Sequence, residues 1–237
     1  MQLIILAAGK GSRLPKKFRS KPKCLTEINS KSILDHNLKF YKLFNKRYII
    51  SGYKSNQLRN YSKINKFKII YNSKYKSTNM VYSAFLSSKY ITNDVVICYG
   101  DILFDPSIIK LLKDKHNILT VYTNWLNLWK KRMSKKMIKL DAENLITKNK
   151  EIKSIGGPII KKYPKYQYMG ILKIKKHSFF DLKKFFDSLN DQKIDMTNFL
   201  NKAIVQKKIS FKIKKYSKFW YEIDTHKDIK VATEEMN

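Results

Sequence analysis

The sequence predicts an α/β fold in which a mainly parallel sheet carries helices on both faces. Short runs rich in Ile, Leu and Val alternate with segments of helical periodicity over residues 1–125. This alternation is typical of parallel strands joined by right-handed crossovers. Glycines also follow three of the predicted strands, at Gly9, Gly52 and Gly100. Ligands bind beyond the carboxyl ends of strands in such sheets, so these glycines mark the expected binding edge.

The elements of the first half follow from apolar runs and capping signals. Each predicted strand is a short apolar run ended by turn residues, and these strands cover residues 2–6, 46–51, 67–71, 94–99 and 117–123. Predicted helices cover 32–44, 55–61 and 78–90, and a further helix begins at Pro106. Ser32, Thr78 and Asp105 are the expected N-caps.

The second half has a different pattern, with shorter strands and longer gaps. Strands are predicted at 138–140, 152–155, 167–174, 209–213 and 219–223, and helices at 177–189 and 197–206. Thr225 begins a final helix, and Asp228 three residues later indicates a capping box. Because no repeat or low-complexity linker interrupts the chain, we expect one domain over residues 1–237. Its second half forms a small C-terminal lid or extension on the same sheet.

The composition limits the class of protein. No apolar run approaches the roughly 20 residues that a membrane-spanning helix needs, so we expect no transmembrane segment. The run Leu3–Leu6 is too short for a signal-peptide core, which leads us to expect a cytoplasmic location. Cys24 and Cys98 cannot form a disulfide framework, and we expect reduced thiols in or near the core.

The net charge of +32, from 50 basic and 18 acidic residues, is a strong field for anions. Nucleic acid, anionic membrane and phosphorylated substrates could all respond to it. Only five of the basic residues are Arg, the residue suited to phosphate and guanine contacts, and the lysines are spread along the chain. We therefore expect no dedicated nucleic-acid site. AT-rich codons encode Lys, Asn, Ile, Tyr and Phe, so a low-GC genome accounts for the lysine content.

The segment "LAAGKGSRL" directly after the first strand predicts an anion-binding loop. Gly9 and Gly11 let backbone N–H groups approach an anion because no Cβ blocks the way. Ser12 adds a hydroxyl, and Arg13 and Lys23 add positive charge suited to a triphosphate. The segment lacks the GxxxxGK[ST] pattern, and Leu at position 14 excludes GxGxxG.

Three carboxylates are candidates for a Mg²⁺ site. Asp101 follows a hydrophobic strand at the predicted ligand edge, where helix capping ahead of Pro106 is the alternative. Glu222 and Asp224 are two residues apart, so in a strand both point to one face and repel each other unless a cation lies between them. Asp224 could instead cap the last helix. Mg²⁺ prefers such hard oxygen ligands.

Seven segments together resemble the nucleotidyltransferase family that includes sugar-1-phosphate nucleotidylyltransferases. They run through nearly the whole chain in order: "LAAGKGSRL", "KPKCL", "STNMVYSAF", "CYGDILF", "QYMGILK", "DMTNFL" and "WYEIDTHKDI". The phosphocholine and phosphonate cytidylyltransferase branch is the most similar. The resemblance implies a Rossmann-like, GT-A-like nucleotidyltransferase fold. It also implies a nucleotide-binding half, residues 1–124, and a half that binds the acceptor and completes the metal site, residues 125–237.

The resemblance also implies roles for individual residues. Base and ribose would be held by the loop backbone and its neighbours: Leu6, Ala7, Ala8, Gly9, Gly11, Gly52, Thr78, Asn79 and Gly100. Ser12, Arg13 and Lys23 would hold the triphosphate, with Arg13 and Lys23 catalytic and Lys23 offsetting charge on the α-phosphate. Asp101, Asp224 and Glu222 would bind Mg²⁺. The acceptor would contact Tyr168, Gly170, Asp195 and Trp220.

The acceptor itself is left open by the sequence. A choline-like group would favour aromatic rings with acidic residues nearby, for which Asp141, Glu143 and Asp195 are candidates. Asp195 could equally be a helix cap, and the helical spacing of Trp125 and Trp129 favours packing. An amino-acid phosphate or aminoethylphosphonate would fit equally well.

The function expected from the sequence is Mg²⁺-dependent transfer of CMP from CTP to a small phosphate or phosphonate, with release of pyrophosphate. Phosphocholine, 2-aminoethylphosphonate and phosphoglutamine are the acceptor types, in surface-polysaccharide or phosphonate biosynthesis. One alternative is a sugar-1-phosphate nucleotidylyltransferase that uses UTP or dTTP, and another is a non-catalytic basic binding protein. A homodimer stays open.

Overall fold

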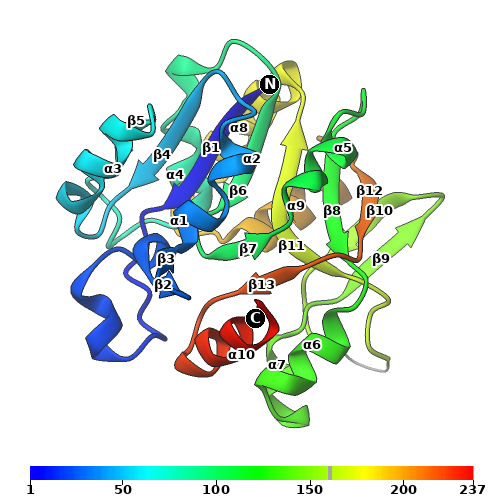
Figure 1. Ribbon diagram of the computed structural model, residues 1–237. Coiled ribbons are helices and arrows are strands. Elements are labelled where there is room, and N and C mark those ends of the chain that lie inside the picture. The colour runs from blue at the N-terminus through cyan, green and yellow to red at the C-terminus, as the bar shows by residue number, and fades with distance from the viewer. Residues whose placement is uncertain (160–161, 237) are drawn as a thin grey trace.

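The computed structural model describes residues 1–159 and 162–236, and its centre is a mixed sheet (Figure 1). Among the described residues this sheet has nine strands, in the order β5-β4-β1-β6-β11-β8-β12-β10-β9. The strands are β1 (Gln2–Ala7), β4 (Arg47–Ser51), β5 (Lys68–Tyr71), β6 (Val95–Tyr99), β8 (Ile118–Tyr122), β9 (Leu145–Lys148), β10 (Glu151–Ile155), β11 (Gln167–Ile174) and β12 (Lys212–Tyr216).

The pairing divides the sheet into two parallel groups. Strands β5, β4, β1 and β6 are parallel to their neighbours, and so are β8 and β12. Strand β11 is antiparallel to both β6 and β8 and so joins the groups, while β10 and β9 form an antiparallel edge. The predicted α/β class is confirmed, and strands from both halves of the chain share one sheet.

Helices cover both faces of the sheet (Figure 1). They are α1 (Ile33–His36), α2 (Leu38–Tyr41), α3 (Arg59–Ile64), α4 (Met80–Phe85), α5 (Ile109–Leu112), α6 (Trp125–Arg132), α7 (Lys135–Asp141), α8 (Lys176–Ser188), α9 (Met196–Val205) and α10 (His226–Met236). One core contains residues of α1, α2, α5, α6 and α10, and the other contains residues of α4, α8 and α9. Successive residues of β1 serve both, since Leu3 and Ile5 lie in the first core and Ile4 in the second.

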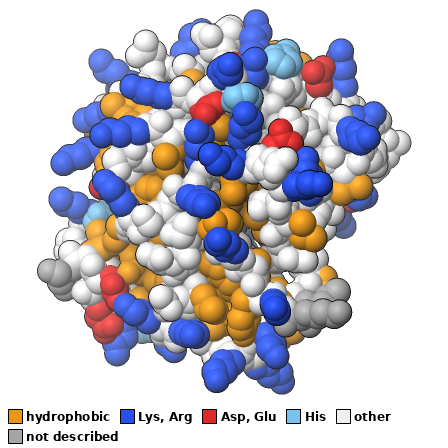
Figure 2. Space-filling model, turned by 90° about the vertical axis from the view of Figure 1, so that its right-hand side faces the viewer, with side chains coloured by type: hydrophobic (Ala, Val, Ile, Leu, Met, Phe, Trp, Pro, Cys, Tyr) orange, Lys and Arg blue, Asp and Glu red, His pale blue; other side chains and the backbone are white. Residues whose placement is uncertain are grey.

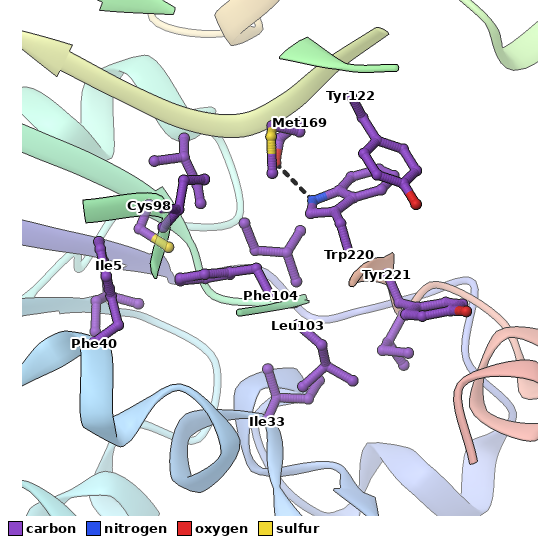
Figure 3. Packing of buried hydrophobic residues seen from close by; sticks show 14 of the residues in the cluster. Ile5, Ile33, Phe40, Cys98, Leu103, Phe104, Tyr122, Met169, Trp220 and Tyr221 are labelled. Carbon is purple, nitrogen blue, oxygen red and sulfur yellow. Dashed lines mark hydrogen bonds between the residues drawn. The ribbon is translucent and has the colours of Figure 1, made fainter. Parts of the chain in front are cut away.

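The first core holds a small antiparallel pair that matters for the site. Strand β7 (Ile102–Phe104) pairs with β13 (Trp220–Glu222), so that Glu222 lies opposite Ile102. Figure 3 shows the indole ring of Trp220, the first residue of β13, beside Met169 of β11. Its N–H donates to the carbonyl of Met169 at 3.0 Å. Buried indoles usually need such a partner. The bond fixes β13 against β11 and thereby sets where the residues after Trp220 lie.

Several local predictions were wrong. Residues 138–140 lie in α7, where Ile138 is buried and Leu140 is exposed. Two residues two positions apart share a face in a strand but not in a helix, so the apolar pair gave a misleading strand signal. The strands β7 and β9 were not predicted, nor was the hairpin of β2 (Glu27–Ile28) and β3 (Lys31–Ser32). All are four residues or shorter, which leaves too few positions for a periodic signal.

Two predicted helices are interrupted. The helix over 32–44 breaks into α1 and α2 at Asn37, whose buried amide donates to the carbonyl of Ile102 at 2.7 Å. The helix over 78–90 breaks into α4 (Met80–Phe85) and a short 3₁₀ helix at Ser88–Tyr90, and its N-cap is Asn79 where Thr78 was expected. The predicted caps Ser32 and Asp105 are confirmed.

The surface carries its positive charge widely. Figure 2 shows Lys and Arg side chains spread over the whole of one face, among scattered hydrophobic patches. Cys24 and Cys98 are buried free thiols, as expected. Within residues 1–159 and 162–236, no helix combines the length and the apolar character needed to cross a membrane.

Candidate active site

The loop after β1 turns back over the end of the sheet and borders a cavity of about 370 Å³, here called the loop cavity. At Gly11 the backbone has φ +64°, and a Cβ there would lie 3.2 Å from Cβ of Lys23. Glycine therefore lets the loop lie against the Lys23 side chain. Predicted nucleotide residues line this cavity together with Lys10 and Cys24: Leu6, Ala7, Gly9, Gly11, Ser12, Arg13, Lys23, Asn79 and Gly100.

A second cavity of about 150 Å³, the side cavity, adjoins the first through Leu6, Gly9 and Asn79. Ala8 and Thr78 line it, as do Tyr75 and Tyr99. The side chain of Asn79 is already engaged, because its oxygen accepts from the N–H of Met80 and its amide donates to the carbonyl of Lys193. The two tyrosines were not predicted, although Tyr99 directly precedes Gly100 at the expected ligand edge.

Gly52 lies apart from these cavities. It lines an open groove with Lys54, Ser55 and Arg59, and Tyr75 separates that groove from the side cavity by lining both. A Cβ at Gly52 would come within 2.7 Å of the carbonyl oxygen of Ala8. The structure thus gives Gly52 a packing role behind the loop.

Three carboxylates meet at the edge of the loop cavity: Asp101 and Asp224 line this cavity, and Glu222 lies beside them. Asp101 follows β6, and the N–H of Ile223 donates to its carbonyl at 2.9 Å, which brings the end of β13 beside it. One carboxylate oxygen from each of Asp101, Glu222 and Asp224 lies within 4.8 Å of the others. Residues more than 100 positions apart in the chain are therefore joined by the β7–β13 pair.

Lys23 reaches this cluster from the loop side. Its Nζ lies 2.7 Å from Oδ2 of Asp101 and 2.5 Å from Oδ1 of Asp224. Burial alone would lower the pKa of Lys23, but the attraction of the two carboxylates outweighs it and raises the pKa well above its usual value. Lys23 is thus a fixed cation. Arg13 also pairs with Asp224, at 2.9 Å, from a more exposed position.

The cluster fits a divalent cation. The side chain of Asp224 is 3% exposed, and burial together with repulsion from Asp224 and Asp101 raises the pKa of Glu222 to about 8. Oδ1 of Asp101 is buried and accepts no hydrogen bond from any described residue. Carboxylate oxygens are the ligands that Mg²⁺ takes in proteins, and a double positive charge would relieve this repulsion.

A third cavity of about 210 Å³, the aromatic cavity, lies on the other side of the cluster and shares Arg13 with the loop cavity. The four predicted acceptor residues line it, together with Glu222: Tyr168, Gly170, Asp195 and Trp220. Gly170 has φ +77°, and a Cβ there would lie 2.9 Å from the ring of Tyr99. Asp195 also caps α9 through the N–H of Asn198, which confirms its expected role as a helix cap, while its contact with an acceptor stays a prediction.

Acidic and aromatic side chains give this cavity its character. Asp141 and Glu143 line it, and burial raises the pKa of Glu143, with repulsion from Asp195 and Asp141 adding to the rise. Trp129 packs edge-on against Trp125, as its spacing predicted, yet it also lines the cavity. Its indole Nε1 is buried and has no partner among the described residues. Helical spacing alone could not show that one ring of the pair faces a cavity.

Comparisons with known proteins agree that the chain is similar to nucleotidyltransferases. The sequence model of the MobA-like NTP transferase domain matches residues 3–141. The chain is 32% identical to the CTP:phosphoglutamine cytidylyltransferase of Campylobacter jejuni subsp. jejuni serotype O:2, over 99% of this chain and 100% of the relative. It is 33% identical to the choline-phosphate cytidylyltransferase of Streptococcus pneumoniae, over 44% of this chain and 46% of the relative.

Solved structures show the same fold. The CTP:phosphocholine cytidylyltransferase of Streptococcus pneumoniae matches with a TM-score of 0.77 at 19% identity, covering 100% of this chain and 99% of that chain. The inositol-1-phosphate CTP transferase of T. maritima matches with a TM-score of 0.78 at 22% identity, covering 98% and 94%.

Proposed function

Because the chain belongs to the MobA-like NTP transferase family, we propose that it transfers CMP from CTP to a small phosphate or phosphonate, with Mg²⁺ as cofactor and pyrophosphate as second product. The chain is a nucleotidyltransferase, and its relatives support a cytidylyltransferase that acts on small phosphorylated substrates. One observation carries the proposal. Lys23, Asp101 and Asp224 meet in the loop cavity, and Glu222 of the same acidic cluster lines the aromatic cavity.

The loop cavity receives the nucleotide. Backbone N–H groups of the loop and the side chains of Ser12, Arg13 and Lys23 bind the triphosphate, since fixed cations and unobstructed N–H groups favour such an anion. The side cavity, between Thr78, Asn79 and Tyr99, lies beside the loop backbone and takes the base. Residues 1–124 thus form the nucleotide-binding half.

The carboxylates of Asp101, Glu222 and Asp224 hold Mg²⁺, which when bound offsets negative charge on the phosphates. The ammonium group of Lys23 then stabilises the negative charge that builds up on the α-phosphate during attack. An oxygen of the acceptor phosphate attacks the α-phosphorus, the bond from that phosphorus to the bridging oxygen breaks, and pyrophosphate leaves with the electron pair. Positioning and charge neutralisation supply the acceleration, and no protein nucleophile is needed.

The aromatic cavity receives the acceptor, in the half formed by residues 125–237. Asp141, Glu143 and Asp195 place negative charge in a protein whose net charge is +32, so the cavity favours a substrate end that bears an ammonium group. The rings of Tyr168 and Trp220 add faces that attract cations. Phosphocholine, 2-aminoethylphosphonate and phosphoglutamine all carry such a group. A hexose phosphate carries none, which disfavours the sugar-1-phosphate alternative.

A screen of substrates tests the proposal. CTP, UTP and dTTP are each incubated with the protein, Mg²⁺ and one of four acceptors: phosphocholine, 2-aminoethylphosphonate, phosphoglutamine or glucose-1-phosphate. Released pyrophosphate is measured with and without a chelator. We expect release with CTP and at least one ammonium-bearing acceptor, and none once the metal is chelated.

The screen also separates the alternatives. Release with UTP or dTTP and glucose-1-phosphate alone would replace the proposal by the sugar branch. If no pair releases pyrophosphate while the protein binds DNA or RNA in a strongly salt-dependent way, the chain is a basic binding protein.

A further inference from the structure

A buried ion pair lies behind the acidic cluster, and no step described above uses it. Nε of Arg132 is 2.7 Å from Oδ1 of Asp228, and the two side chains are 3% and 4% exposed. The contact is electrostatic, because Nε and Nη1 of Arg132 donate no hydrogen bond to any described residue. Arg132 ends α6 and Asp228 lies in the first turn of α10, so the pair joins two helices. Neither residue is among those described as lining the three cavities.

The second oxygen of Asp228 holds the segment that carries Asp224. Oδ2 accepts from the N–H of Asp224 at 3.0 Å, from the N–H of Thr225 at 2.7 Å and from the hydroxyl of Thr225 at 3.0 Å. The N–H of Asp228 donates back to the Thr225 hydroxyl, which completes the predicted capping box. One carboxylate therefore fixes both the backbone of Asp224 and the start of α10.

We propose that Asp228, oriented by Arg132, is a positioning residue that directs the Asp224 carboxylate into the acidic cluster. The inference rests on the proposed function, since it concerns how that site holds its cation. Capping a helix needs only the Thr225–Asp228 box, which works as well at an exposed position. Burying an Arg against that box has a large desolvation cost, and what it adds is a fixed orientation of the carboxylate.

The position of Arg132 strengthens the argument. Its guanidinium lies 5.8 Å from the ring centroid of Trp129, which lines the aromatic cavity one turn earlier on α6. Helix α6 thus lines the aromatic cavity through Trp129 and contacts, through Arg132, the carboxylate that holds the segment of Asp224.

The inference is tested without turnover by measuring the binding of Mn²⁺ alone with electron paramagnetic resonance. Asp228→Asn keeps an oxygen for the two N–H groups but loses the charge that pairs with Arg132, whereas Asp228→Ala loses both. Loss of a residue that orients a metal ligand typically weakens metal affinity about 10-fold or more, so we expect a Kd about 10-fold higher for Asp228→Asn and a larger increase for Asp228→Ala. The Mg²⁺ concentration for half-maximal turnover should rise in parallel, while the KM for the acceptor stays unchanged.

The chain offers a matched control. Lys131 pairs with Glu235 at exposed positions and joins the same two helices. Lys131→Met removes this neighbouring ion pair and should leave the Mn²⁺ Kd at its wild-type value. Arg132→Lys keeps the charge but not the geometry, and should give an intermediate Kd even if Asp228→Ala does not fold.

Each outcome decides the question. A lower Tm for Asp228→Asn with wild-type Mn²⁺ affinity would show a purely structural role and overturn the inference, as would a wild-type protein that binds no Mn²⁺. Equal weakening by Lys131→Met would do the same. If the wild-type protein binds Mn²⁺ but releases no pyrophosphate in the screen, the proposed function fails. The Mn²⁺ Kd values of the variants still test the positioning role of Asp228 in that case.

Discussion

The loop cavity and the aromatic cavity meet at one acidic cluster but are built in opposite ways. The cations of the loop cavity, Lys10, Arg13 and Lys23, all come from residues 6–25. The walls of the aromatic cavity come mostly from α4, α6, α7, α9, β6, β7, β11 and β13, to which the loop adds Arg13. One cavity is cationic and the other acidic and aromatic. Under the proposed function, one short segment would supply the cations that bind the phosphates, and residues from many elements would bind the acceptor.

The largest expected effect concerns the cluster that both cavities share. Asp101→Ala removes a carboxylate with a buried, unpartnered oxygen, so we expect loss of Mn²⁺ binding and a kcat about 1000-fold lower. The fold should stay intact, because Lys23 keeps Asp224 as a partner. Pyrophosphate release, Mn²⁺ binding and Tm measure the three effects.

Asp181→Ala, at an exposed position on α8, is the control and should behave as wild type. Near-normal turnover by Asp101→Ala would show that the acidic cluster between the two cavities is not the catalytic centre.

Lys23→Ala tests the cationic side alone. Removing one charge that stabilises the α-phosphate should lower kcat by roughly 100-fold and raise the KM for CTP. Unlike Asp101→Ala, this variant should still bind Mn²⁺, because all three carboxylates remain. The exposed Lys63→Ala serves as control in steady-state kinetics. Loss of Mn²⁺ binding in Lys23→Ala would mean that Lys23 supports the acidic cluster rather than the nucleotide.

The same contrast explains what the sequence could predict. The loop and its lysine are contiguous, so "LAAGKGSRL" and "KPKCL" were sufficient to locate them. Asp101 was found because it follows a buried strand, and Glu222 and Asp224 were found because two carboxylates lie two residues apart in a predicted strand. The aromatic cavity was harder, since Trp129 shows only the spacing of a packed helix and Tyr99 only that of a strand end. Arg132 and Asp228 gave no sign of their pairing, because no local pattern reports which residues of α6 and α10 face each other.

Glu143→Gln tests the acidic side. If the carboxylate binds the ammonium group of the acceptor, its loss removes an attraction between opposite charges, and the KM for the acceptor should rise about 10-fold or more. The KM for CTP should not change, since Glu143 lines the aromatic cavity and is not among the described residues that line the loop cavity. An increase in both KM values would show that the two cavities do not serve separate substrates.

The pH dependence of acceptor binding gives a smaller effect of the same origin. Burial raises the pKa of Glu143, so its carboxylate gains a proton at a higher pH than an ordinary glutamate does. Lowering the pH through this raised pKa neutralises Glu143, and the KM for the acceptor should then rise. Steady-state kinetics with phosphocholine remove titration of the ammonium group, because that group is quaternary. Its phosphate, with a second pKa of about 6, titrates equally with the wild-type and Glu143→Gln proteins, so the difference between their pH profiles reports Glu143. In Glu143→Gln this part of the pH dependence should disappear, and its persistence would assign it to another group.

The smallest expected effect distinguishes acceptors within the aromatic cavity. Trp129→Phe keeps an aromatic ring beside Trp125 but removes the buried indole N–H that has no partner among the described residues. An acceptor with an oxygen at its distal end, such as phosphoglutamine, can accept that N–H, and losing one neutral hydrogen bond should raise its KM about 2- to 10-fold. Phosphocholine has no oxygen at that end, so its KM should stay constant. An equal change for both acceptors would mean that Trp129 shapes the cavity wall without donating to the substrate, and the choice between acceptors would then depend on the acidic residues alone.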